Sequence, residues 1–139
     1  MIRRVIASAL GLIIGMAGGC APKPDYLFVD PSRGNVRVEL RRTLGVIRRS
    51  ESPVPLTDCA FYRLPPPGDA SGRPPEELWR ILSLSPDHAA LEIRYGIIPE
   101  GFTQVTPVDR PPPPLASGDR YAVECTGDGI GVTEFRMPE

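Results

Sequence analysis

Residues 121–137 read YAVECTGDGIGVTEFRM, and this stretch decides the fold class because it has the pattern of two short strands joined by a tight turn. Tyr121, Val123 and Cys125 alternate with other residues, so an extended chain places them on one face. The sequence Gly-Asp-Gly at 127–129 forms turns readily, because glycine tolerates positive φ. The stretch therefore predicts a β-hairpin whose second strand ends near Met137.

Working outward from the hairpin, residues 91–97 carry the clearest alternation in the chain, and Pro99 follows them. Residues 36–41 alternate in the same way, with Val36, Val38 and Leu40 on one face. That strand either continues through Leu44 or folds back after Thr43. Shorter strands are expected at 26–29, before a turn at 30–34, and at 59–64 and 102–106.

Residues 75–80 are ambiguous, because a proline followed by acids suits a helix start while the apolar positions alternate as in a strand. Strand is favoured, since Pro86 leaves little room for a helix. Residues 111–114 are four prolines, which predict a rigid polyproline spacer. Eight or so short strands and no long helix predict an all-β domain, a single small sandwich, with a small β-barrel as the alternative.

A local motif at residues 115–123, LASGDRYAV, resembles the tyrosine corner of fibronectin type III and immunoglobulin-like domains. The resemblance implies that the hydroxyl of Tyr121 returns to the backbone a few residues upstream and pins the crossover between two sheets. The motif departs from antibody domains, because Cys125 follows the tyrosine by four positions rather than two. Trp79 has no assigned place on the usual core strand.

The first residues of the chain have the order of an export signal. Met1-Ile2-Arg3-Arg4 precedes an apolar run at 5–17, and Gly18-Gly19-Cys20 follows. Thirteen residues span only about 20 Å as a helix, against roughly 30 Å of hydrocarbon, so the run is too short to cross a membrane comfortably. A buried core helix would need neither the two arginines nor the glycines.

The end of this run, Ala17-Gly18-Gly19-Cys20, resembles the lipobox of bacterial lipoprotein precursors, with Ala17 where leucine is usual. The resemblance implies that a diacylglyceryl group is attached to Cys20, that cleavage precedes this cysteine, and that acylation follows. A plain cleaved signal is the alternative. Ala21 in place of aspartate implies the outer membrane, and several acyl chains would hold the protein there stably.

These features divide the chain into a signal peptide at 1–19, a lipidated start and linker at 20–25, and a β domain at 26–139. The linker is short and stiff, with a reach of about 18 Å, so the domain should sit close to the bilayer. Of 139 residues, removal of 19 leaves 120, enough for one domain. Removing Arg3 and Arg4 lowers the basic count from 16 to 14 against 17 acids, and a net charge near −3 argues against nucleic acid as a partner.

Of three cysteines, Cys59 and Cys125 remain as a pair after Cys20 is assigned to lipid. An exported protein meets oxidising conditions, so a Cys59–Cys125 disulfide is predicted. A zinc or redox site is the alternative, but no Cys-x-x-Cys occurs and His88 is the one imidazole. We therefore predict no metal and no cofactor.

Candidate catalytic residues are few. His88 lies among turn residues beside Asp87, and sequence neighbours rarely face each other, so a solvated loop histidine is expected. Glu76 and Glu77 more readily decorate the start of a strand or helix than form a carboxylate pair. No nucleophile-elbow motif and no phosphate-binding glycine loop occurs, so we expect no enzymatic activity.

An arginine cluster is the strongest feature without an obvious structural purpose. Residues 33–49 contain one acid, Glu39, against Arg33, Arg37, Arg41, Arg42, Arg48 and Arg49. Arginine forks bind phosphate and carboxylate groups at two points, which predicts binding to anionic lipid head groups or glycan. Alternating arginines on an edge strand also prevent pairing with another chain, and this protective interpretation is the alternative.

Together these observations predict a membrane-anchored lipoprotein of the bacterial cell envelope that faces the periplasm and acts by contact. The expected role is that of an interaction or assembly partner of another envelope protein. The alternative is a binding module for anionic glycan or lipid head groups through the arginine cluster. The sequence leaves open whether a small molecule binds.

Overall fold

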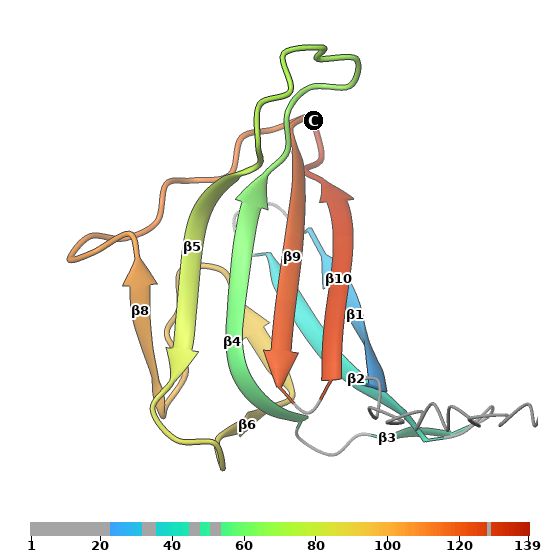
Figure 1. Cartoon of the computed structure of the whole chain (residues 1–139), viewed down its shortest axis with the longest axis vertical. Coiled ribbons are helices and arrows are strands. Elements are labelled where there is room, and N and C mark those ends of the chain that lie inside the picture. Colours follow the sequence, from blue (N-terminus) through green and yellow to red (C-terminus); the bar gives the residue numbers. More distant parts are fainter. Residues whose placement is uncertain (1–22, 32–35, 45–47, 51–53, 128) are drawn as a thin grey trace, which may run out of the picture.

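The computed structural model describes residues 23–31, 36–44, 48–50, 54–127 and 129–139, and in these residues it is built from strands alone (Figure 1). Across those ranges, no helix is long and apolar enough to cross a bilayer. The predicted signal helix, cleavage site and Cys20 lie outside the described residues. The strands are β1 (Lys23–Asp30), β2 (Arg37–Leu44), β3 (Arg48–Ser50), β4 (Val54–Arg63), β5 (Glu76–Ser83), β6 (Ala89–Ala90), β7 (Glu92–Arg94), β8 (Phe102–Thr106), β9 (Arg120–Gly127) and β10 (Gly129–Arg136).

The strands form two layers. The first has the order β10-β9-β4-β5-β8, and the second contains β1, β2 and β3, with β7 paired to β2 (Figure 1). Strand β1 joins the layers, because its first residues pair with β10 in parallel and its remainder pairs with β2. The two ends of this path, β3 and β8, are not paired with each other, so the described strands form an open sandwich and not a closed barrel.

The core lies between the layers and follows from the alternation of apolar residues. Val36, Val38 and Leu40 are all buried, as predicted, and Ile93 of β7 is fully buried beside them. The first layer contributes the largest side chains. Phe61 and Trp79 have ring centroids 5.5 Å apart, and each of these side chains stabilises the fold by roughly 1.5–3 kcal/mol through burial.

The predicted hairpin is confirmed, since β9 and β10 pair antiparallel with Tyr121 opposite Phe135 and Cys125 opposite Gly131. Strand is also confirmed over the ambiguous residues 76–80, where β5 places Trp79 and Ile81 in the core. The edge strand at 102–106 is likewise present, and the four prolines at 111–114 lie outside every strand.

The prediction of a strand across residues 91–97 is wrong in extent, because β7 covers only Glu92–Arg94. Gly96 has φ of +79°, a left-handed conformation that breaks the extended chain. The amide of Ile97 then donates to the carbonyl of Arg94 at 3.0 Å, which closes a turn. As a result, the side chain of Ile97 is 52% exposed although the alternation placed it in the core.

Other strand boundaries differ from the prediction or decide between its alternatives. Strand β1 begins at Lys23, inside the linker predicted at 20–25, because Lys23 and Pro24 pair with Gly129 and Ile130. The first strand therefore begins three residues earlier than the strand expected at 26–29. The open alternative near Thr43 is also decided, since β2 ends at Leu44 and β3 returns antiparallel beside it.

Candidate functional site

The predicted disulfide is confirmed and joins neighbouring strands of one sheet. Cys59 of β4 and Cys125 of β9 are direct register partners with Cα atoms 4.1 Å apart, and both are buried. Immunoglobulin domains instead bridge their two sheets with a disulfide. Trp79 lies on β5, which neighbours β4 in the first layer.

The Tyr121 side chain makes the backbone contact that its motif implies. Tyr121 is fully buried at the start of β9, and its hydroxyl accepts a hydrogen bond from the amide of Ala116 at 2.8 Å. Phe135 on the neighbouring strand stacks against its ring at 5.6 Å. These contacts hold the loop after the proline spacer against the sandwich.

His88 is less solvated than predicted. Its Nδ1 lies 3.3 Å from Oγ of Ser83, and its ring packs over Gly101, where an added Cβ would lie 2.6 Å from the imidazole. Ser83 is already engaged, because its hydroxyl bonds the carbonyl of Ser85 and accepts from the Ser85 amide. The contact with His88 is therefore part of a turn network between β5 and β6.

The structure divides the predicted arginine cluster. Arg33 lies outside the described residues. Arg37, at the start of β2, lies within 3.6 Å of carboxylate oxygens of Asp30, Glu39 and Glu92. Three acids thus surround Arg37 at that end of the strand, so we remove it from the candidate anion-binding set.

The other four arginines lie at the opposite end of β2 and on β3. Arg41 and Arg42 pair in register with Tyr26 and Asp25 of β1. Arg48 and Arg49 on β3 pair with Leu44 and Thr43. We call this end of β1, β2 and β3 the anchor-side corner, because Lys23 begins the strand that follows Cys20, the residue predicted to carry a lipid anchor. The corner is defined by Lys23, Arg41, Arg42, Arg48 and Arg49.

The protective interpretation accounts for only part of this corner. Strand β3 is an edge strand, so Arg48 and Arg49 would discourage pairing with another chain. Strand β2 is interior there, because Arg42 pairs with both Asp25 on β1 and Ser50 on β3. Edge protection therefore gives no reason for Arg41 and Arg42.

A polar network covers the outward face of the first layer. The Arg80 guanidinium donates to Asp58 at 3.0 Å, to Glu77 at 2.7 Å and to the hydroxyl of Tyr62 at 2.8 Å. Thr106 on β8 donates to the other oxygen of Glu77 at 2.7 Å. Hydrogen bonds from Arg80 lower the pKa of Glu77, and burial raises the pKa of Tyr62. All three nitrogens of the Arg80 guanidinium donate hydrogen bonds, so this network stabilises the sheet.

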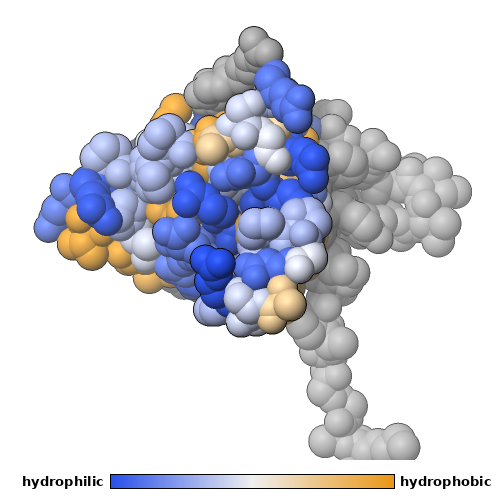
Figure 2. Space-filling model, turned by 90° about the horizontal axis from the view of Figure 1, so that it is seen from above, coloured by the Kyte–Doolittle hydropathy of each residue, from blue (hydrophilic) through white to orange (hydrophobic). Residues whose placement is uncertain are grey.

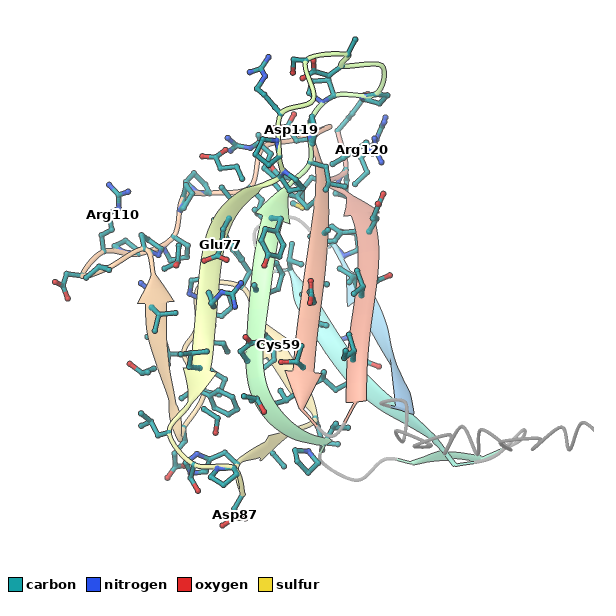
Figure 3. All side chains as sticks on the ribbon, in the orientation of Figure 1. Cys59, Glu77, Asp87, Arg110, Asp119 and Arg120 are labelled. Carbon is teal, nitrogen blue, oxygen red and sulfur yellow. A yellow bond between two sulfur atoms is a disulfide. The ribbon has the colours of Figure 1, made fainter. Side chains whose placement is uncertain are left out.

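A second charged feature, missed in the sequence, lies at the end of the sandwich opposite Lys23. Arg63 ends β4, Arg120 begins β9 and Arg136 ends β10, so three neighbouring strands bring three arginines together. They line a shallow pocket of about 220 Å³ with Asp119 and the segment Leu64-Pro65-Pro66-Pro67. We call this end the distal pole. Figure 3 labels Asp119 and Arg120 there, and Figure 2, which looks down on it, shows mostly hydrophilic surface.

Charges at the distal pole are largely balanced. Arg63 lies 3.1 Å from Glu76 and 3.7 Å from Asp119, and Arg120 lies 2.9 Å from Glu134. A second pocket of about 250 Å³ shares Arg63 and Leu64 with the first and adds Asp69 and Arg73, which pair with each other. The pole is thus a mixed apolar and ion-paired surface, suited to protein contact more than to a free anion.

Comparison with known proteins finds no family model, no curated protein and no solved structure that matches the chain. The described residues also contain no group of three or more histidine, cysteine, aspartate or glutamate side chains placed to hold a metal ion. The candidate sites are therefore the anchor-side corner and the distal pole, each formed where neighbouring strands of this chain end together.

Proposed function

We propose that this chain is a lipid-anchored lipoprotein of the bacterial cell envelope that acts by binding another envelope protein, without enzymatic activity. The attachment group would be a lipid on Cys20, which places the domain at the outer membrane, facing the periplasm. The order of basic residues, apolar run, small residues and cysteine supports this anchor.

The observation that carries the proposal is the pairing of Lys23 with Gly129. It places the first strand residue after Cys20 at one end of the β9–β10 ladder, whereas Arg120 and Arg136 pair at the other end. The eight residues of β10 span about 24 Å between those ends. A chain held at Cys20 would therefore direct the distal pole away from the bilayer, toward a partner in the periplasm.

The anchor is tested by the mass of the mature amino terminus. We expect a terminal peptide that begins at Cys20 and carries added acyl mass, and we expect incorporation of labelled fatty acid. Cys20→Ala should abolish both. Recovery of an unprocessed chain that begins at Met1 in the cytosol would refute the anchor.

The contact surface is tested with a photo-reactive residue placed at one position at a time in the anchored protein. Placement at Pro66 or Asp119, both on the distal pole, should give one discrete adduct of constant mass. Placement at Asp87, at the opposite end of the first layer in Figure 3, serves as the matched control. Equal adducts from Asp87, or none from the pole, would contradict a partner bound there.

The second candidate function is binding of anionic glycan or lipid head groups. It is favoured by one observation, the placement of Arg41, Arg42, Arg48 and Arg49 on adjacent strands at one corner. This function is compatible with the first, because the two surfaces lie at opposite ends of the sandwich.

A further inference from the structure

We propose that the anchor-side corner is a membrane-docking surface that binds anionic lipid head groups, with Ile130 and Val132 seated at the edge of the bilayer. The inference deepens the proposed function, since it rests on Cys20 holding this same end of the domain at a membrane. It adds a second contact, made by the folded domain itself, that fixes the orientation of the sandwich.

Basic residues gather at the anchor-side corner. Five basic residues occupy the corner, where Asp25 of β1 pairs in register with Arg42 of β2. A domain that is acidic as a whole therefore concentrates positive charge at the end nearest its predicted anchor.

The corner lies close to the predicted anchor residue, Cys20. Lys23 follows Cys20 by three positions, which limits the reach of that connection to about 10 Å. The Debye length at physiological ionic strength is about 8 Å, so charges at the corner lie within the field of an anionic surface. A cell-wall polymer would have no such fixed proximity, and for this reason we assign the corner to lipid.

Strand β10, which adjoins the corner, exposes two apolar side chains. Ile130 pairs with Pro24 and is 45% exposed, and Val132 is 61% exposed two residues further along β10. The next outward residue, Glu134, is charged. The exposed apolar positions of β10 thus occur at its anchor-side end, where interfacial contacts of about 5–10 Å depth would reach them.

The test uses residues 20–139 with Cys20→Ser, a form that contains every described strand and carries no lipid. We expect it to sediment with vesicles of phosphatidylcholine containing about a third phosphatidylglycerol, and not with phosphatidylcholine alone. Binding should weaken as salt rises from about 50 to about 500 mM, because screening shortens the reach of the charges. Arg41→Ala with Arg42→Ala should weaken binding about 30-fold, at roughly fivefold per arginine.

The matched control is Arg120→Ala with Arg136→Ala at the distal pole, which removes the same charge and should leave vesicle binding unchanged. Val132→Ser should weaken binding severalfold while leaving its salt dependence intact. Circular dichroism of each variant verifies folding, and the salt series on the form with only Cys20→Ser tests the proposal without any further substitution.

Three results would overturn the inference: equal binding to neutral vesicles, no sedimentation with anionic ones, or the same loss from the corner and distal pairs. Salt-sensitive binding to soluble anionic glycan without vesicle binding would also overturn it and favour a glycan ligand. None of these results bears on lipid attachment, because the tested form lacks Cys20 and the anchor is tested separately by fatty-acid labelling.

Discussion

A single hydroxyl group, that of Tyr121, connects the start of β9 to the loop that precedes it. Tyr121→Phe removes the acceptor for the Ala116 amide and should lower the free energy of unfolding by about 1 kcal/mol. Urea titration measures the change. Tyr95→Phe is the control, because the hydroxyl of Tyr95 donates to the exposed carbonyl of Pro113, which water can satisfy after substitution. An equal loss in both variants would contradict a special role for Tyr121.

The ionisation of Glu77 makes the stability of the folded sheet depend on pH. Hydrogen bonds from Arg80 hold its pKa below the ordinary value of 4.5, so ionised Glu77 stabilises the folded state. This contribution is present above pH 4.5 and is lost as pH falls through the lower folded pKa. We expect Glu77→Gln to be less stable than the parent at about pH 7 and the difference to shrink toward about pH 3, measured by urea midpoints. Glu134→Gln, at a side chain 61% exposed, should show a smaller difference.

At the scale of elements, the disulfide locks the central pair of the first layer. Cys59 and Cys125 are 66 residues apart in sequence, and closing a loop of that length stabilises the fold by about 4 kcal/mol in the chain-entropy model. Reduction should lower the free energy of unfolding by about that amount, measured by urea titration with and without reductant. Cys59→Ala with Cys125→Ala should match the reduced protein and be insensitive to reductant. A reductant effect that persists in this double variant would show that another group is responsible.

At the scale of the whole molecule, both layers share one core. Trp79 of the first layer contacts Tyr95, which follows β7 of the second, with ring centroids 5.5 Å apart. We therefore expect tryptophan fluorescence and far-ultraviolet circular dichroism to report one coincident unfolding transition. A fluorescence change that precedes the loss of strand signal would contradict a shared core. Since Trp79 is the one tryptophan of the chain, the fluorescence assignment is unambiguous.

The arrangement of the whole molecule also separates its two candidate surfaces. Lys23 marks one end of the β9–β10 ladder, and the arginines of the distal pole mark the other. An interaction module held close to a bilayer needs such a separation, because a partner cannot reach a surface that faces lipid. The two proposals can therefore be tested independently, by substitutions at opposite ends.

The sequence by itself determined most of the strands and, for β2 and β9, their inward faces. Alternation is a local property of an extended chain, so the pattern alone places Val38 and Tyr121 on strands. Two cysteines remain once Cys20 is assigned to lipid, and this pair likewise predicted the Cys59–Cys125 disulfide. Alternation failed at Ile97, because the turn conformation of Gly96 depends on surroundings that the pattern does not contain.

Only the tertiary structure decided which strand ends meet. Arg37 and Arg41 look alike in sequence, yet three carboxylates surround Arg37, whereas Arg41 lies near the start of β1. Arg63, Arg120 and Arg136 are far apart in the chain and converge because β4, β9 and β10 pair in register. Strand pairing is a long-range choice, set by how all the apolar faces are buried together, and no local pattern records it.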